Sequence, residues 1–213
     1  MLNFACDVVV PGRPFLRRLI DLTKGLTQPY QHKRLNKEAR ADLMAWSIFI
    51  DCFNGKSMLL NYIWENSLTL QLYTDASNIG FGGFLMDQYF HGIWPMEWQL
   101  YHVTIKELFP IVLAVELWAE HLQNKCIVFH TDNRAVVDII NKQTSKDKTI
   151  MSLVRRLVVQ CLQFNVSFKS EHIPGISNGL ADNLSRQQIT QFLEKFPHKN
   201  PKEVHFSKTS LDI

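Results

Sequence analysis

The sequence lacks the features that mark several common classes of protein. Its four cysteines, Cys6, Cys52, Cys126 and Cys161, lie far apart and form no C-x-x-C pair. We therefore expect free buried thiols rather than a zinc site or a disulfide framework. Apolar runs are short and interrupted by charge or proline, and the N-terminus has none of the sections of a secretory signal. These absences predict an intracellular protein, cytoplasmic or nuclear, that does not enter a membrane.

The glycines do not form a nucleotide-binding motif, and the net charge of the chain is small. The glycines Gly80, Gly82 and Gly83 lack the G-x-G-x-x-G spacing of a dinucleotide site, and we interpret them as room for close backbone packing. The net charge is only +3, but residues 1–60 hold nine Lys and Arg against five Asp and Glu, whereas residues 61–213 hold fourteen against fifteen. A basic excess can attract a polyanion, and a solvated helix face gives the same count.

The 213 residues, 46% of them apolar, are enough for a domain with a sizeable core and an appendage. Before residue 60, apolar residues recur at helical spacing in two stretches, the second from Ala39 to Phe53. From Leu68 they alternate as in a half-buried strand. The whole order, β-β-β-α-β-α-α-β-α, favours a mixed sheet with helices on its faces. The first strand ends at Asp75, and two short strands joined near residues 87–88 follow it. We then expect a helix over 104–122, a strand over 126–131 and a helix over 134–141. The last predicted elements are an amphipathic helix around 153–162, a strand over 165–173 and a helix over 179–187.

Four acidic residues lie at the ends of these predicted elements. Asp75 ends one strand in LYTDAS, and Asp132 ends another in FHTDNR. Glu107 and Asp182 lie near the starts of helices. Each has an ordinary explanation, because Asp begins turns, Glu107 could complete a capping box with Thr104, and an acid favours the helix dipole. The residue types alone therefore leave a structural role open for each of them.

Taken together, the four acids predict a common site. If the strands that end at Asp75 and Asp132 are neighbours, their carboxylates lie side by side, and the two helices can bring Glu107 and Asp182 to the same place. Crowded like charges raise each other's pKa unless a cation holds them. Mg²⁺ accepts such oxygen ligands, and two ions about 4 Å apart can hold the attacking water and the leaving oxygen of a phosphodiester. The pattern predicts metal-assisted phosphodiester hydrolysis.

Four segments in order resemble the ribonuclease H domain of retroelement reverse transcriptases. They are YTDAS, KELFPIVLAV, FHTDN and HIPGISNGLADNLSR. The stretch from VVVPGRPF to FIDCFNG is similar to the region that joins polymerase to ribonuclease H in DIRS-type, tyrosine-recombinase retrotransposons. The resemblance implies a ribonuclease H-like mixed five-stranded sheet flanked by helices over residues 67–190, preceded by a helical connection or thumb-like segment over residues 1–60. Residues 191–213, with two prolines and many polar residues, are expected to form a loosely ordered tail.

The resemblance also implies catalytic roles. The metal-binding quartet of the family falls on Asp75, Glu107, Asp132 and Asp182, and all four residue types match. One ion would be held mainly by Asp75, Asp132 and Asp182, and the other by Asp75, Glu107 and Asp132. His172 fits the family histidine that assists proton movement or product departure, although a histidine beside a glutamate at a strand end is often structural. The implied cofactors are two Mg²⁺ ions, for which Mn²⁺ can substitute.

The implied substrate is the RNA strand of an RNA/DNA hybrid, cut to leave 5′-phosphate and 3′-hydroxyl ends. Asn133 is a candidate substrate contact and an equally good helix N-cap, and Ser77 and Asn78 are further candidates. The original partner would be the polymerase part of the same polyprotein, since the chain has no Y-x-D-D polymerase motif. A catalytically inactive remnant that binds nucleic acid or a protein partner is an alternative. A transposase or integrase of the same broad fold fits less well, because those enzymes use three acids.

Two departures from the family pattern bear on the site. Pro110 lies inside the first predicted helix of the domain, so we expect a kink or a later start than Thr104, either of which would change the aim of Glu107. The separate basic helix of some cellular members is also missing. Basic residues further along could partly replace it or simply solvate a loop and a helix: Lys142, Lys146, Lys148, Arg155 and Arg156.

Overall fold

The computed structural model describes residues 2–6, 9–28, 30–51, 64–65, 70, 72–197 and 200–211. Contacts between Cα atoms divide the chain into two compact units, Met1–Tyr62 and Ile63–Ile213. Cys6 and Cys161 are buried, as predicted, whereas Cys126 is half-buried, and Cys52 lies outside the described residues. Within these described ranges, no helix combines the length and apolarity needed to cross a membrane.

The described part of the first unit is helical. Its elements are α1 (Leu2–Ala5), the 3-10 helix η1 (Val10–Phe15), α2 (Arg17–Thr23) and α3 (Lys37–Asp51). The buried side of α3 carries Asp42 and Trp46, and the Asp42 carboxylate accepts a hydrogen bond from Arg18 at 3.2 Å. The sequence predicts an apolar stripe on this helix made of Ala39, Leu43, Trp46, Ile50 and Phe53. Ala39 and Trp46 are buried, as predicted, whereas Leu43 and Ile50 are exposed and Phe53 lies outside the described residues. Apolar spacing did not indicate the buried Asp42, whose position the ion pair with Arg18 allows.

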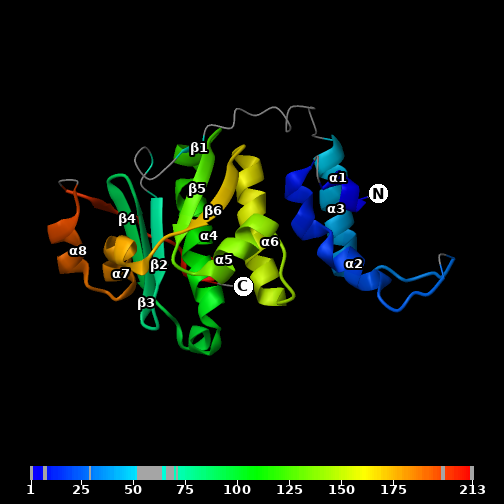
Figure 1. The fold of residues 1–213 in the computed structure, drawn as a ribbon, viewed down its shortest axis with the longest axis horizontal. Helices are drawn as coiled ribbons and strands as arrows, with labels where there is room; N and C mark the ends of the chain where they lie inside the picture. Colours follow the sequence, from blue (N-terminus) through cyan, green and yellow to red (C-terminus); the bar gives the residue numbers. More distant parts are fainter. Residues whose placement is uncertain are drawn as a thin grey trace. The chain divides into compact units, whose positions relative to one another are not determined.

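The second unit is a mixed sheet with helices on both faces (Figure 1). Its strands are β1 (Trp64–Glu65), β2 (Leu72–Ala76), β3 (Gly80–Leu85), β4 (Gln88–Ile93), β5 (Cys126–Thr131), β6 (Ser167–His172) and β7 (Lys202–Glu203). β2, β3 and β4 are antiparallel neighbours, and β5 and β6 continue the sheet parallel to β2. β6 pairs along the whole of one edge of β5. On the other edge, β1 pairs with the first residues of β5 and β2 pairs near its end. The predicted strands are β2 to β6, and β1 and β7 extend them.

Helices cover the two faces of this sheet in separate groups. They are α4 (Val103–Leu122), α5 (Arg134–Lys142), α6 (Lys148–Gln163), α7 (Gly179–Ser185) and α8 (Ile189–Lys195), with 3-10 helices η2 (Met96–Leu100), η3 (Gly175–Asn178) and η4 (Lys208–Leu211). Phe81 of β3 contacts Phe109 of α4, whereas Phe84 of the same strand contacts Phe192 of α8. Since the side chains of a strand alternate in direction, α4 and α8 lie on opposite faces. Most side chains of α4 are buried, so this helix forms the centre of the core.

Helix α4 differs from the prediction made from its proline. It begins at Val103, and Pro110 lies within it. The residue of α4 with non-helical dihedral angles is Trp118, at φ −117° and ψ 18°. Glu107 therefore lies in regular helix, and the expected kink or late start does not disturb its aim.

The described residues of the C-terminal stretch, 191–197 and 200–211, include side chains that pack on the sheet, contrary to the expectation of a loosely ordered tail. Phe192 and Phe196 of this stretch are buried in the cluster that covers β3 and β4. β7 pairs with β4, and the ring of Phe206 lies 5.5 Å from that of Phe81. The tail is held by a few aromatic side chains, whose spacing forms no regular period in the sequence.

Candidate active site

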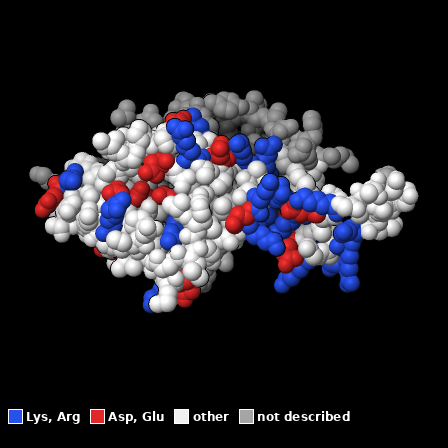
Figure 2. Space-filling view, turned by 60° about the horizontal axis from the view of Figure 1, so that its bottom comes forward, with Lys and Arg blue, Asp and Glu red and all other residues white. Residues whose placement is uncertain are grey.

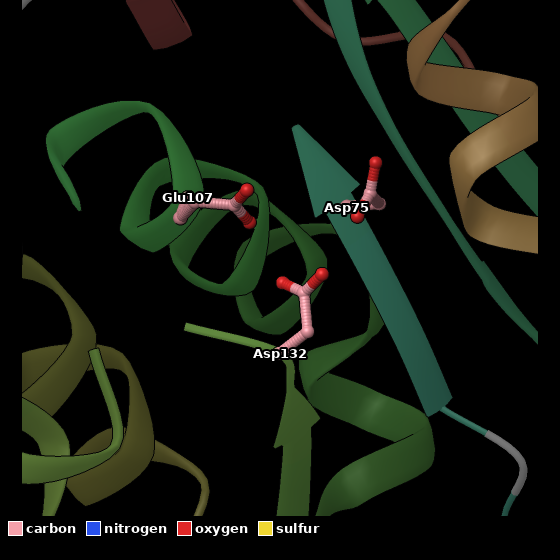
Figure 3. A group of neighbouring side chains, drawn as sticks. All are labelled: Asp75, Glu107 and Asp132. Carbon is pink, nitrogen blue, oxygen red and sulfur yellow. The ribbon is translucent and has the colours of Figure 1, made fainter. Parts of the chain in front are cut away.

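Three of the four predicted acids come together at one end of the sheet. Tyr73 of β2 pairs with His130 of β5, so Asp75 and Asp132, two residues further along each chain, are neighbours. Glu107 reaches the same place from α4 (Figure 3). The ligand oxygens of Asp75, Glu107 and Asp132 all lie within 4.8 Å of one another. Asp75 and Glu107 are buried, and Asp132 is exposed.

Glu107 is not the glutamate of a capping box. The N-cap of α4 is His102, whose Nδ1 accepts a hydrogen bond from the Thr104 N–H at 3.2 Å. The structural alternative that paired Glu107 with Thr104 is therefore wrong, because Glu107 lies beyond the third helical position. Its carboxylate instead accepts a hydrogen bond from the backbone N–H of Ala76, at the end of β2. The side chain thus points from the first helical turns to the strand end that carries Asp75.

Burial and the charges of neighbouring acids make Asp75 and Glu107 resist ionisation. Burial, followed by the charges of Asp75 and Asp132, raises the pKa of Glu107 to about 9. Burial also raises the pKa of Asp75 to about 7, and the charges of Asp182 and Asp132 act in the same direction. A divalent cation would remove this repulsion, so the three carboxylates fit such an ion by charge as well as by ligand type.

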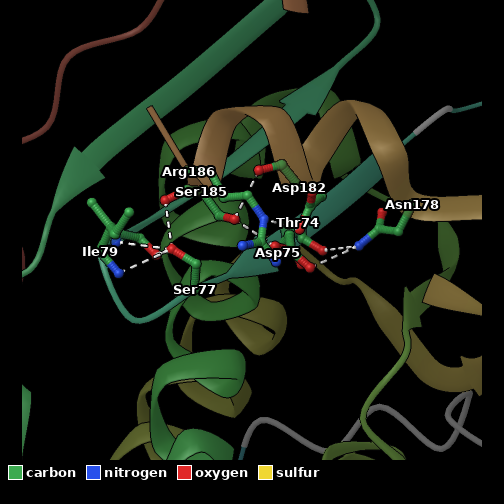
Figure 4. A network of polar contacts seen from close by, with 9 residues as sticks. Thr74, Asp75, Ser77, Ile79, Asn178, Asp182, Ser185 and Arg186 are labelled. Atoms are coloured by element: carbon green, nitrogen blue, oxygen red, sulfur yellow. Dashed lines mark hydrogen bonds and ion pairs between the residues drawn. The ribbon is translucent and has the colours of Figure 1, made fainter. Parts of the chain in front are cut away.

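Asp182 lies near these three acids but outside the group. It is in the first turn of α7, and its charge raises the pKa of Asp75. Arg186 Nε donates a hydrogen bond to Asp182 Oδ1 at 2.7 Å (Figure 4). The ion pair between residues one helical turn apart holds the Asp182 side chain on α7. Its role as the fourth metal ligand stays a prediction.

His172 lies next to Asp132, at the end of β6. Its Nε2 is 3.1 Å from the backbone oxygen of Asp132, and the side chain is exposed. The turn that follows also approaches Asp132: a Cβ added at Gly175 would be 3.0 Å from Asp132 Oδ2. Glycine at this position therefore lets the loop after β6 come up against the acidic group.

The predicted substrate contacts divide into two kinds. Asn133 Oδ1 accepts hydrogen bonds from the N–H groups of Ala135 and Val136 at 3.0 and 3.3 Å, so it caps α5. Ser77 Oγ donates to the Ser185 carbonyl at 2.8 Å and fixes the turn between β2 and β3. Asn78 is exposed in that turn. Asn133 and Ser77 thus have structural roles, and a contact of any of the three with substrate stays a prediction.

Two residues that the sequence reasoning missed hold the Asp75 carboxylate. Ser185 Oγ donates to Asp75 Oδ2 at 2.6 Å, and Asn178 Nδ2 donates to Asp75 Oδ1 at 3.2 Å (Figure 4). Asn178 Nδ2 also lies 3.0 Å from the Thr74 carbonyl oxygen. Both side chains are buried. A signal for Ser185 exists in the sequence, because it follows Asp182 by three residues and so lies on the same side of a helix.

Close packing of α7 on β3 brings Ser185 to Asp75. Gly82 pairs with Asp75 across the two strands, and a Cβ added at Gly82 would be 2.4 Å from the Leu184 Cβ. Any larger residue would push α7 away from the sheet. The interpretation of the glycine cluster as room for close packing is confirmed at this position.

We predict that Ser185→Ala changes the pH profile of any activity that uses Asp75. The Ser185 hydrogen bond lowers the pKa of Asp75, so its loss raises that pKa and moves the acidic limb of the profile to higher pH. Loss of a buried hydrogen bond to a charged group, about 1.5–3 kcal/mol, predicts a fall in kcat of about tenfold or more. Steady-state kinetics between pH 6 and 9 measure both effects. Ser152→Ala, at an exposed position of α6, is the control, and an unshifted profile for Ser185→Ala would show that Ser185 does not position Asp75.

Comparisons with known proteins bear on this arrangement. Residues 65–158, which include Asp75, Glu107 and Asp132, match the family model of the RNase H-like domain found in reverse transcriptase. RNase H1 from the halophilic archaeon Halobacterium salinarum NRC-1 is 14% identical, with a TM-score of 0.45 over 56% of this chain and 95% of that one. The N-terminal RNase H domain of a Mycobacterium tuberculosis protein, solved as a fusion with maltose-binding protein, is 14% identical, with a TM-score of 0.41 over 58% and 93% of the two chains. No curated protein matches the chain. Residues 65–158 are therefore similar to an RNase H-like domain, and the predicted fold class, a mixed sheet flanked by helices, is confirmed.

Proposed function

We propose that this chain is a metal-dependent endonuclease that hydrolyses the RNA strand of RNA/DNA hybrids, and that it derives from a retrotransposon polyprotein of the DIRS type. The grouping of the Asp75, Glu107 and Asp132 oxygens within 4.8 Å carries the proposal. The match of residues 65–158 to an RNase H-like domain supports the same class of reaction. The polymerase part of that polyprotein would be the original partner.

The acids fit a pair of divalent ions, Mg²⁺ or Mn²⁺. Bound there, the ions would supply an activated water and charge stabilisation at the phosphodiester. Asp75 is the proposed shared ligand, because Ser185 and Asn178 fix both of its oxygens and each oxygen keeps a further lone pair. Ligand oxygens of both Glu107 and Asp132 lie within 4.8 Å of it. Asp182 would join them after its carboxylate leaves Arg186.

His172 is proposed to move a proton during the reaction or product departure. A carbonyl oxygen only accepts hydrogen bonds, so Nε2 carries the proton in the contact with the Asp132 carbonyl. Nδ1 is then left to accept a proton. This arrangement supports the proposed role of His172 in proton transfer.

Binding of the hybrid is proposed to depend on phosphate contacts from basic residues after α5. Lys142 forms an ion pair with Asp138 at 3.1 Å, and Arg156 Nη2 donates to Glu116 at 2.7 Å, so these two have structural partners. Lys146 and Lys148 are exposed. Figure 2 shows basic and acidic side chains interspersed on the face in view. The proposed affinity therefore rests on a few phosphate contacts and falls steeply with salt.

A gel assay of three labelled duplexes tests the proposed function. With Mg²⁺ present, we expect cleavage of the RNA strand of an RNA/DNA hybrid and none of an RNA duplex or a DNA duplex, because the site must recognise 2′-hydroxyl groups on one strand. EDTA should abolish the cleavage, and the products should carry 5′-phosphates. Binding of the hybrid without cleavage would favour the inactive remnant, and cleavage or joining of DNA strands would favour the transposase class.

A further inference from the structure

A groove lies beside the acidic group, between the sheet and the helices α7 and α8. It has a volume of about 450 Å³, and its lining includes Tyr73, Phe84, Ser177, Asn178, Leu180 and Lys195. This volume is in the range of ligand pockets and suits a ligand of one nucleotide. Asn178 belongs to both sites, because its amide nitrogen donates to Asp75.

The floor of this groove is made of aromatic rings from neighbouring strands. Tyr73 stacks on Phe84 with ring centroids 5.2 Å apart and an interplanar angle of 19°. On its other side it stacks on His130 at 6.0 Å and 26°. Both faces of the Tyr73 ring are therefore occupied, and the ring offers its edge. Ring edges are electropositive and favour contact with the electron-rich face of another flat ring.

The polar lining comprises an unsatisfied acceptor and a free cation. Asn178 is 3% exposed, and its Oδ1 has no hydrogen-bond partner among the described residues. Native proteins seldom leave a buried amide oxygen unpaired. The atom is itself enclosed, so a ligand donor reaches it from the groove after a small movement of the Asn178 side chain. Lys195 is exposed, and no ion pair joins it to any residue that the structure describes. A lysine ammonium in this position suits a phosphate.

We propose that this groove binds a single nucleotide. The base lies over the ring edges of Tyr73 and Phe84, an N–H group of the base or sugar hydroxyl donates to Asn178 Oδ1, and the phosphate lies at Lys195. The nucleotide is either free in solution or the unpaired last nucleotide of a strand. This site goes beyond the proposed nuclease function, since it needs neither metal nor cleavage.

Equilibrium dialysis of the full chain with adenosine 5′-monophosphate, without divalent metal, tests the proposal. Adenosine and ribose 5-phosphate each carry half of the ligand, and we expect both to bind at least tenfold more weakly. Lys195→Ala should weaken binding of the nucleotide at least fivefold, and Lys195→Arg should restore it. Lys208→Ala removes an exposed charge outside the groove and should have no effect. Equal binding to wild type and Lys195→Ala, or no preference for the nucleotide over ribose 5-phosphate, would overturn the proposal.

Amide chemical shifts locate the ligand, and a competing strand identifies its source. Addition of the nucleotide should shift the backbone signals of Ser177, Gly179 and Leu180, and shifts confined to other regions would refute the site. A duplex with one unpaired 3′ nucleotide should compete with the nucleotide if the natural ligand is a strand end, whereas a blunt duplex should not. If neither duplex competes with the nucleotide, the natural ligand is a free nucleotide. These measurements involve no cleavage, so they stand or fail separately from the nuclease assay.

Discussion

Asp75→Asn is expected to lower the Mg²⁺-dependent cleavage of hybrid RNA by about a thousandfold or more, which corresponds to about 4 kcal/mol of transition-state stabilisation. The substitution keeps the shape of the side chain but removes the negative charge that both proposed ions share. The buried position supports this expectation, because Asp75 is 6% exposed and water cannot easily take its place as a ligand. Single-turnover cleavage of a labelled hybrid measures the effect.

The matched control for this variant is Asp138→Asn. Asp138 is an exposed acid of α5 that forms an ion pair with Lys142, so the same chemical change there should leave the rate within about twofold. Thermal unfolding should show that both variants fold. If folded Asp75→Asn cleaved as fast as wild type, the acidic group would not be the active site.

Glu107→Gln is expected to stabilise the metal-free protein at alkaline pH while it abolishes cleavage. The pKa of Glu107 is raised from 4.5 to about 9 and that of Asp75 from 3.8 to about 7. Between about pH 4 and 9 the folded state holds protons that the unfolded state has lost, so the free energy of unfolding falls as pH rises. The glutamine side chain of Glu107→Gln would carry no charge, so the variant avoids the larger share of this fall in the free energy of unfolding, on the order of 2–4 kcal/mol at pH 8.5. The midpoint of thermal unfolding should rise by several degrees, since about 1 kcal/mol shifts it by about 2–4 °C at this size.

Mg²⁺ should reverse this order of stability. A ligand that binds only the folded state stabilises it, so the wild-type midpoint should rise with Mg²⁺ and that of Glu107→Gln should change little. Glu120→Gln, at an exposed position of the same helix, is the control for loss of one charge. A wild-type midpoint that stays constant from pH 5 to 9 without metal would contradict the pKa assignment.

The sequence predicted the elements that position the acids, because that prediction depends on local patterns. The alternation of apolar residues from Leu68 predicted a strand that ends at Asp75; β2 confirms its second half, and residues 68, 69 and 71 lie outside the described residues. The strand ends placed Asp75 and Asp132 side by side on the condition that the two strands were neighbours, which the pairing of β2 with β5 confirms. The long apolar helix that carries Glu107 was also evident. The ion pair of Asp182 with Arg186 was missed although its spacing of four residues is typical of pairs on one face of a helix.

Long-range contacts account for what the sequence did not predict. His102 caps α4 in place of Thr104, and that choice depends on the loop that precedes the helix. Asn178 supports Asp75 from 103 residues away, a distance at which no periodicity applies. The packed tail depends on Phe192 and Phe206, whose partners Phe84 and Phe81 lie on β3, far away in the sequence.

The packing of Leu184 on Gly82 has a consequence for the order in which the protein becomes competent during synthesis. Asp75, Glu107 and Asp132 emerge early from the ribosome, but Ser185 follows Asp75 by 110 residues. A nascent chain that ends before α7 would have the acids without the hydroxyl that holds Asp75. The proposed nuclease would then reach its full activity only when α7 docks on the sheet.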